Sequence, residues 1–502
     1  MKNRPLSKPA YYYFNMSSLF PIPRIPKLTF PYLLAVALAA GSLIGHASEP
    51  LQAGAFAADV SPKEWPLFLR GTFNARPAET SHDPLKARTL VLSDGAIPLS
   101  ITIVDSLMIN RDNLDKAKAI ASEQTGIPMD RMLVAATHTH TAPASYVQRG
   151  TKAEIAYEKR LIEGIADSIV QATKNLQAAE IAWGGADLPD EVFNRRWFMK
   201  PGTMPKNPFG ELDQVKMYPP RVPEKLVKAA GPVDPEVSIL SVRDADGRPL
   251  CLLGNYSLHY VGGVPPGQVS ADYFGRFASL VGTRLSKDKP LDGFVGILSN
   301  GTSGDVNNVN YLKPRPPREP FEQINIVAGK TADAAWRAYQ DAADSHSEIV
   351  PLGMIEREIS LKLRHPSPER VERAKEILAM SESAQKLLPR LSKDYAMRTL
   401  NQAKAEESIS IKIQAIRIGE LAIVTFPFEV FAETGLDLKA RSPFADTFVI
   451  ELANGADGYL PTPKQHKLGG YETWLPTNRV QIDTSDIITD NLLEMLGELK
   501  AM

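Results

Sequence analysis

The sequence predicts an α/β protein, because apolar segments typical of strands alternate with longer segments typical of helices. Residues 89–92 and 99–105 are apolar and are separated by a Ser-Asp-Gly turn sequence, so they predict two consecutive strands. Helical segments at 113–125 and 154–176 lie on either side of a third apolar segment, Met132-Leu133-Val134, which predicts another strand.

The alternation continues through the rest of the chain. The remaining predicted elements are a hairpin over 237–242 and 250–253, a strand over 294–298, a helix over 321–343, and a hairpin over 409–418 and 421–426. Residues 198–235 are rich in Pro, Lys and Gly, and we expect them to form a surface excursion beside the active site. Residues 366–407 are charged and helical in pattern, which predicts an inserted helical hairpin with a solvated face.

The amino-acid composition excludes several classes of protein and of metal site. With 502 residues and 43% hydrophobic residues, the chain can form two to four domains or one large α/β unit with a packed core. The 57 basic and 58 acidic residues nearly cancel, so the chain lacks the net positive charge that is typical of nucleic-acid-binding proteins. A single cysteine, Cys251, excludes an intrachain disulfide framework and a Cys-rich zinc site. A metal ion would therefore need His, Asp, Glu or Tyr ligands.

Residues 1–58 are expected to form a leader. Lysines and arginines precede the apolar run 28–44, and small residues at 45–47 and 55–57 have the spacing of signal-peptide cleavage sites. The protein is then exported, to be periplasmic, secreted or surface-associated; an uncleaved N-terminal anchor is the alternative. The catalytic domain is expected to span residues 59–502.

Two histidines follow the apolar segment 132–134 in the sequence Thr137-His138-Thr139-His140. Side chains two residues apart on a strand point the same way, so a strand running into this segment would direct both imidazoles to one place. Neutral imidazole is the commonest protein ligand for zinc. The alternative is that both histidines only form hydrogen bonds with the backbone at a strand end.

Further polar residues follow other apolar segments. His259 lies beyond the hairpin, and Glu429 lies within the apolar run 426–431, where its burial requires a cation or a strong donor nearby. The small polar loop 299–308 can bring backbone amides close to a ligand, and Asn300 and Asp305 in this loop are the expected substrate-binding residues. The alternatives are a structural histidine, a structural salt bridge and a simple tight turn.

These landmarks occur in a fixed order. The order is T-H-T-H at 137–140, N-Y-S-L-H at 255–259, G-D-V at 304–306, P-F-E at 427–429, G-Y-L-P-T at 458–462 and G-G-Y-E at 469–472. Taken together, they resemble the neutral (non-lysosomal) ceramidases over most of residues 59–476. The resemblance implies a layered α/β sandwich with two mixed β-sheets flanked by helices. It also implies zinc-dependent hydrolysis of an amide bond.

The resemblance also implies roles for individual residues. One Zn²⁺ ion would be bound by the metal ligands His138, His259, Glu429 and Tyr459. His140 matches a residue that lines the site, and it is expected to orient the attacking water or to stabilise the oxyanion. Arg195, within Phe193-Asn194-Arg195, matches an arginine that contacts the reacting group.

The chain departs from the family pattern in two places. The family loop typically reads G-D-V-S-P-N, and its serine is catalytically important; Asn307 stands at that position here. The Asn307 amide could instead donate a hydrogen bond to an oxyanion, and Thr302 or Ser303 could substitute for the serine. The chain ends about thirty residues after Gly470, so we expect no C-terminal immunoglobulin-like domain. Both departures make ceramide itself a doubtful substrate.

The sequence therefore predicts a zinc-dependent hydrolase that cleaves an amide bond in an N-acyl, small or lipid-like substrate. The alternatives are an ester hydrolase with the same metal centre, a non-catalytic binding protein that retains the fold, and an α/β protein without metal. We expect no nucleic-acid partner and no obligate protein partner, whereas the leader and the substrate class allow association with a membrane surface.

Overall fold

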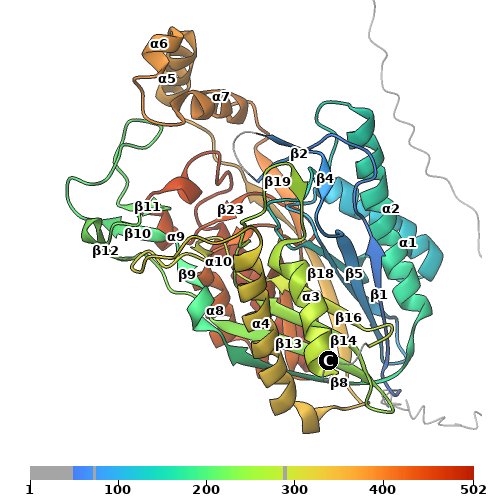
Figure 1. Cartoon of the computed structure of the whole chain (residues 1–502). Coiled ribbons are helices and arrows are strands. Elements are labelled where there is room, and N and C mark those ends of the chain that lie inside the picture. The colour runs from blue at the N-terminus through green and yellow to red at the C-terminus, as the bar shows by residue number, and fades with distance from the viewer. Residues whose placement is uncertain (1–48, 72–74, 287–290) are drawn as a thin grey trace, which may run out of the picture. The chain divides into compact units, whose positions relative to one another are not determined.

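The computed structural model describes residues 49–71, 75–286 and 291–502, and its largest element is a mixed eight-stranded sheet (Figure 1). The strand order is β16-β14-β13-β8-β1-β5-β6-β7. The pairs β14/β16 and β6/β7 are parallel, and the other neighbours are antiparallel. Its strands are β1 (Gln52–Asp59), β5 (Lys86–Ser93), β6 (Leu99–Val104), β7 (Met132–Ala136), β8 (Gln177–Asp187), β13 (Glu236–Asp244), β14 (Pro249–Tyr256) and β16 (Val295–Asn300).

A second mixed sheet of four strands packs against the first. Its order is β18-β19-β20-β22, with β22 parallel to β20 and the other pairs antiparallel. One continuous apolar cluster contains Ile101 and Ile297 of the first sheet and Ile416 and Ile450 of the second, so the sheets stack face to face. The strands are β18 (Leu352–Lys362), β19 (Ser408–Ile418), β20 (Leu421–Phe426) and β22 (Asp446–Glu451). The predicted α/β sandwich with two mixed sheets is confirmed.

Helices cover both outer faces of the sandwich (Figure 1). Their apolar faces pack against the sheets, because strands such as β5 and β6 are buried on both sides and need covering. The helices over the first sheet are α1 (Arg111–Thr125), α2 (Lys152–Lys174), α3 (Asp272–Leu285) and α4 (Glu322–Asp341). Those over the second sheet are α8 (Ala432–Arg441) and α10 (Thr484–Ala501).

The helix ends have local causes in the sequence. The side chain of Asn110 accepts a hydrogen bond from the Asn113 amide at the start of α1, and Thr151 caps α2 in the same way. The helix α1 ends at Gly126, which adopts a left-handed conformation with φ of 76°.

The predicted helical insertion is confirmed and protrudes from the sandwich (Figure 1). Its helices are α5 (Pro368–Ala379), α6 (Glu382–Gln385) and α7 (Ser392–Gln402). The predicted surface excursion contains a small sheet of β10 (Arg196–Met199), β11 (Val215–Met217) and β12 (Leu226–Ala229). Short strands complete the structure: β2 (Leu67–Leu69), β3 (Arg76–Ala78), β4 (Thr80–Ser81), β9 (Phe193–Asn194), β15 (Gln268–Val269), β17 (Val306–Asn307), β21 (Glu429–Val430) and β23 (Tyr459–Leu460), with the short helix α9 (Pro463–His466).

The expected boundary between residues 58 and 59 is wrong. Residues Gln52–Asp59 form strand β1, which pairs with β5 along its whole length, so this segment belongs to the folded domain. The cleavage-like spacing at 55–57 arises because β1 is rich in alanine and glycine, and cleavage there would remove part of a central strand. The apolar run 28–44 lies outside the described residues. In the described ranges, no helix is long and apolar enough to cross a membrane.

Candidate metal centre and active site

The candidate site lies where strands of both sheets end. His138 follows β7 and His259 follows β14 in the eight-stranded sheet, whereas Glu429 follows β20 in the four-stranded sheet. An isolated bridge between Ala135 and Ala453 joins the two sheets at this edge. Ligand sites in α/β proteins commonly lie beyond the carboxyl ends of strands, because the loops there are free to carry functional side chains.

The two histidines of the T-H-T-H motif meet, although not for the predicted reason. Strand β7 ends at Ala136, and His138 adopts a left-handed backbone conformation with φ of 70°. The His138 amide donates a hydrogen bond to the carbonyl of Ser106 at 2.9 Å, which holds this uncommon conformation in place. A turn, rather than a continuing strand, therefore brings the two imidazoles together.

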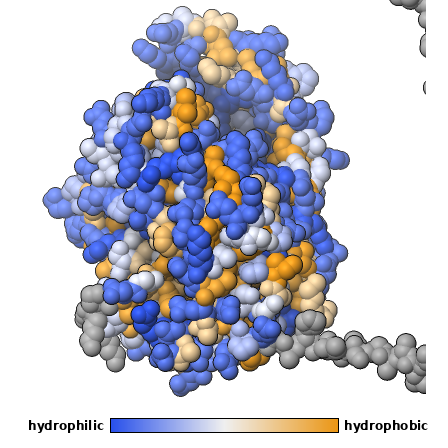
Figure 2. Space-filling model, turned by 90° about the vertical axis from the view of Figure 1, so that its right-hand side faces the viewer, coloured by the Kyte–Doolittle hydropathy of each residue, from blue (hydrophilic) through white to orange (hydrophobic). Residues whose placement is uncertain are grey.

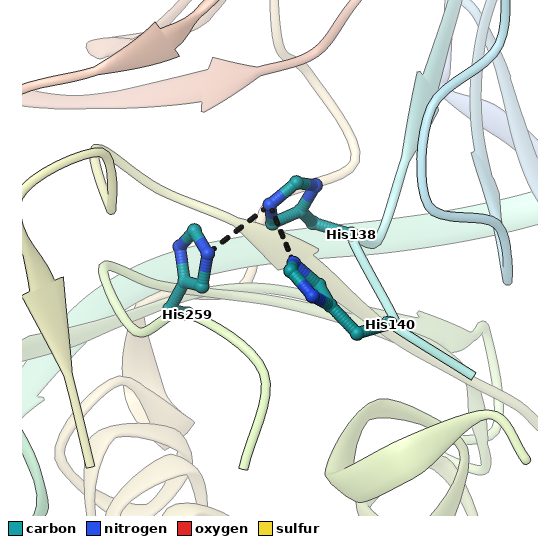
Figure 3. A group of neighbouring side chains, drawn as sticks. All are labelled: His138, His140 and His259. Atoms are coloured by element: carbon teal, nitrogen blue, oxygen red, sulfur yellow. Dashed lines mark hydrogen bonds between the residues drawn. The ribbon is translucent and has the colours of Figure 1, made fainter. Parts of the chain in front are cut away.

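Three imidazoles converge at one point (Figure 3). The Nε2 atom of His138 lies 3.2 Å from Nε2 of His259 and 3.1 Å from Nε2 of His140. His138 and His259 are each 1% exposed, whereas His140 is partly exposed and stacks on Tyr260. His140 is therefore the histidine of this group on the open side of the site.

The other ring nitrogens determine the tautomers. The Nδ1 atoms of His138 and His140 each lie 2.9 Å from a backbone carbonyl oxygen, of Leu107 and Gly71 respectively. Nδ1 of His259 lies 3.1 Å from the carbonyl of Ser303. A carbonyl oxygen can only accept, so each neutral ring carries its hydrogen on Nδ1. Each Nε2 atom then presents a lone pair to the same point.

A carboxylate completes this group. Glu429 Oε2 lies 3.3 Å from His138 Nε2 and 4.0 Å from His259 Nε2, and this buried oxygen accepts no hydrogen bond from the described residues. Zinc bonds to nitrogen and oxygen are about 2.0–2.1 Å, so tetrahedral ligand atoms are about 3.3 Å apart. The donor set and its spacing therefore fit zinc, because a cation would satisfy lone pairs that otherwise repel one another.

Burial adjusts the protonation of these groups. The pKa values of His140 and His259 are well below their ordinary value, chiefly because burial disfavours the charged imidazolium. Burial would also lower the pKa of His138, but Glu429 opposes it and the net pKa is raised. His140 and His259 therefore stay neutral, as metal ligands and hydrogen-bond acceptors must be.

Tyr459 and Arg195 stand next to this group. Tyr459 pairs in β23 with Glu429 in β21, so the two residues occupy matching positions on neighbouring parallel strands. Arg195 is almost fully buried, and its Nη2 donates to the Tyr459 hydroxyl at 3.2 Å and to the Gly304 carbonyl at 2.7 Å. Burial, followed by the charge of Glu429, raises the pKa of Tyr459 well above its ordinary value.

A buried carboxylate that the sequence motifs did not indicate, Glu451, lies behind His259. Glu451 accepts hydrogen bonds from Ser303 Oγ at 2.5 Å, Asn300 Nδ2 at 2.9 Å and the Val430 amide at 2.8 Å. Ser303 Oγ also lies 3.2 Å from His259 Nδ1, so Glu451 fixes the loop that orients this imidazole. Burial raises the pKa of Glu451 to about 8, whereas the hydrogen bonds that it accepts favour its charged form.

Three other expected site residues do not line the cleft. Asn307 Nδ2 donates to the Tyr311 hydroxyl at 3.0 Å, and its Oδ1 accepts from the Val309 amide. Asp305 accepts from the Ala432 amide and from Asn194 Nδ2, and Asn300 donates to Glu451. Asn300 and Asp305 therefore stabilise the loops around the site through these hydrogen bonds. Asn307 does not contact the histidine group.

A cleft of about 1990 Å³ opens above the histidines. Its floor contains the candidate zinc ligands and His140, and its walls include parts of the surface excursion and of the helical insertion. Figure 2 shows the surface receding beneath the protruding insertion at the top of the molecule. The expectation that residues 198–235 lie beside the site is confirmed, since residues 204–208 and 215–218 line this cleft.

Aromatic side chains connect the floor to the outer wall. Tyr459 contacts Tyr471 edge-to-face with ring centroids 5.6 Å apart, and Tyr471 contacts Trp474 at 5.9 Å. Trp474 in turn contacts Tyr395 of the insertion at 5.4 Å. Tyr459, Tyr471 and Trp474 line the cleft, so these rings form an aromatic wall beside the candidate metal ligands, and buried Tyr395 connects this wall to α7.

The fold is shared with solved ceramidases. Neutral ceramidase from Pseudomonas aeruginosa superposes with a TM-score of 0.65 at 16% sequence identity, covering 90% of this chain and 75% of that chain. A ceramidase complexed with C2 gives 0.64 at 17% identity, covering 90% and 76%. No protein-family model and no curated protein sequence matches this chain. At these identities the likeness establishes the shared fold.

Proposed function

We propose that this protein is a zinc-dependent hydrolase that cleaves an amide bond in an N-acyl, lipid-like substrate. The observation that carries the proposal is the convergence of three imidazole Nε2 atoms and Glu429 Oε2 at the floor of the cleft. The ceramidase fold supports the choice of an amide bond, because the two solved relatives with this fold are described as ceramidases.

His138, His259, Glu429 and Tyr459 are the proposed ligands of one Zn²⁺ ion. The short distances from His138 Nε2 to His259 and to Glu429 support three of them, and the strand pairing of Tyr459 with Glu429 supports the fourth. When bound, zinc supplies Lewis-acid activation of a water molecule and of the scissile carbonyl.

His140 has a different proposed role. It lies on the open side of the group, and its neutral Nε2 can accept a hydrogen bond from the attacking water and so orient it. Because Nδ1 carries the hydrogen and donates to Gly71, Nε2 has none to offer to an oxyanion. The structure therefore favours the water-orienting role of His140 over the oxyanion-stabilising role.

Arg195 acts through Tyr459 in this proposal. The guanidinium lies behind the cleft surface and donates to the Tyr459 hydroxyl, so it holds this ring and favours negative charge on its oxygen. The aromatic wall of Tyr459, Tyr471 and Trp474 suits an acyl chain. Export remains a proposal based on the leader sequence.

Elemental analysis of the purified full chain, without added metal, tests the metal centre. We expect about one zinc per chain, and hydrolysis of N-dodecanoyl amides faster than of the matched dodecanoyl esters. Faster ester cleavage would instead indicate an ester hydrolase with the same centre. Zinc-dependent binding without turnover would indicate a binding protein, and no bound zinc even after reconstitution would exclude the proposal.

A pair of variants separates the two roles of the histidines. H259A should lose both zinc and activity, whereas H140A should keep zinc and lose kcat, because His140 orients water in this proposal. Loss of zinc in H140A would instead make His140 a metal ligand. Full zinc occupancy in H259A would show that the ligand assignment is wrong.

A further inference from the structure

The walls of the cleft carry an excess of positive charge that the chain as a whole lacks. Six basic side chains line the cleft, whereas three carboxylates, those of Asp213, Asp394 and Glu429, do so. The whole chain has 57 basic and 58 acidic residues, so this excess is local. The basic residues are Arg70, Arg76, Lys206, Lys216, Arg390 and Arg398.

We propose that the amide substrate carries an anionic group, a carboxylate or a phosphate, and that Lys216 and Arg390 bind this group. The inference rests on the proposed amide hydrolase and names its substrate class. A cleft with low-dielectric walls and charges of one sign concentrates ligands of the opposite sign.

The carboxylates of the cleft form no ion pair with these bases in the described residues. Glu429 belongs to the histidine group, and Asp213 accepts hydrogen bonds from Trp474 Nε1 at 2.9 Å and from Asn207 Nδ2 at 3.2 Å. Within the described residues, none of the six basic side chains lies within 4.0 Å of a carboxylate oxygen. The positive charge therefore remains available to a ligand.

Lys216 and Arg390 come from separate elements and line the same cleft. Lys216 is half-buried on β11 of the surface excursion, and Arg390 lies just before α7 in the insertion. The pKa of Lys216 is lowered, first by burial and then by the charge of Arg390, while Asp213 and Glu472 oppose the shift. An anion bound in the cleft would offset the mutual repulsion of these two cations.

The apolar lining completes the substrate class. Leu387 and Met397 of the insertion are 87% and 53% exposed, and both line the same cleft as Met204 and Met217. Flexible methionines and an exposed leucine provide a surface for an acyl chain. A substrate with an apolar chain and an anionic group, such as an N-acylated amino acid, matches both parts of the cleft.

The first test compares two substrates of equal chain length on the zinc-containing enzyme. N-dodecanoylglycine carries a carboxylate, and N-dodecanoylethanolamine is neutral and of similar size. We expect kcat/KM to be about tenfold higher for the glycine amide at low ionic strength, and the ratio to fall as salt screens the charges. Equal values for the two amides would overturn the inference and leave the hydrolase proposal intact.

A matched pair of double variants locates the effect. K216Q/R390Q should raise KM for the glycine amide about tenfold and leave the ethanolamine amide unchanged. K225Q/K404Q removes the same charge from residues outside the cleft lining and should leave both amides unchanged. Equal losses in the two double variants would show a general charge effect and would contradict a binding role for Lys216 and Arg390.

A binding measurement keeps the inference testable if neither amide is hydrolysed. Calorimetry below the critical micelle concentration can compare dodecyl phosphate with the neutral dodecyl triethylene glycol ether. Tighter binding of dodecyl phosphate, lost in K216Q/R390Q, would support the anion site even though the hydrolase proposal had failed. Equal binding of the two probes would overturn the anion site.

Discussion

The floor and the rim of the cleft differ in nearly every physical respect. At the floor, His138, His259 and Glu429 are buried, and their positions are fixed by hydrogen bonds from their ring nitrogens or by strand pairing. At the rim, Leu387 and Arg390 are exposed side chains on an insertion that protrudes from the sandwich (Figure 1). In the proposed function, the floor would therefore carry the reaction, whereas the rim would select the substrate.

The strongest test of this comparison removes a ligand at the floor. We expect H259A to lose zinc and to lower kcat/KM about 10³-fold, because several kcal/mol of transition-state stabilisation depend on the metal. Elemental analysis and steady-state kinetics measure the two effects. The control is H365A, a histidine outside the cleft lining, which should retain both properties. Retained activity in H259A would mean that the floor does not carry the chemistry.

A smaller effect is expected one layer behind the floor. E451Q keeps the volume of the side chain but places an amide NH₂ where two donors now point, so the loop at Ser303 should shift and His259 should lose its orientation. We expect zinc affinity, measured by competition with a chelator, to fall about 10–100-fold. Unchanged affinity would contradict the positioning role of Glu451. E358Q, at an exposed glutamate, is the matched control.

Substitutions at the rim should change KM, and only for substrates with a long acyl chain. L387D/M397D places charge on the apolar wall, and we expect KM for a dodecanoyl amide to rise about three- to tenfold. The matched acetyl amide should be unaffected, because it has no long acyl chain to contact the apolar side chains of Leu387 and Met397. V227D/I349D changes two exposed apolar residues outside the cleft lining and should leave both substrates unchanged. Equal effects on the two substrates would show that the rim does not select the acyl chain.

The smallest effect on activity is expected at a support beneath the floor. Lys118 is fully buried and donates to Asn454 Oδ1 at 2.6 Å, in the loop that leads to Tyr459. Burial lowers its pKa to about 8, below the ordinary value of 10.5. The unfolded chain therefore binds more protons between these values, and stability should rise as pH increases from about 8 to 10.5, by at most about 3 kcal/mol.

Urea unfolding of the wild type and of K118M at several pH values measures this contribution. The difference between the two curves should show the rise, because K118M has no group to titrate at this position. Activity at pH 7 should stay close to that of the wild type. K116M, on the exposed side of the same helix, should keep the wild-type dependence on pH. Parallel curves for the wild type and K118M would contradict a lowered pKa.

Much of the fold and of the floor could be predicted from the sequence. Apolar runs gave most strands, and the ordered motifs pointed to His138, His259 and Glu429, which the structure brings together. Glu451 shows the same signal as Glu429, a carboxylate within a buried apolar run, and could have been identified in the same way.

Other features depend on contacts that the sequence does not encode locally. Strand β1 is rich in alanine and glycine, like the end of a signal peptide, and only its pairing with β5 distinguishes the two. The direction of Asn307 is set by the pairing of β17 with β9, over a hundred residues away in the chain. The charges of the cleft belong to segments that are far apart in the sequence and meet only after folding.

The division of the floor between two sheets has a consequence for assembly. The strands of the first sheet end at Asn300, and those of the second begin at Leu352, so a single cut between residues 345 and 351 would leave each sheet on its own fragment. The proposed zinc ligands would then be shared out in pairs, His138 and His259 on one fragment and Glu429 and Tyr459 on the other. Each fragment would carry only half of the proposed ligand set, so binding of zinc by all four ligands would report that the two fragments have joined.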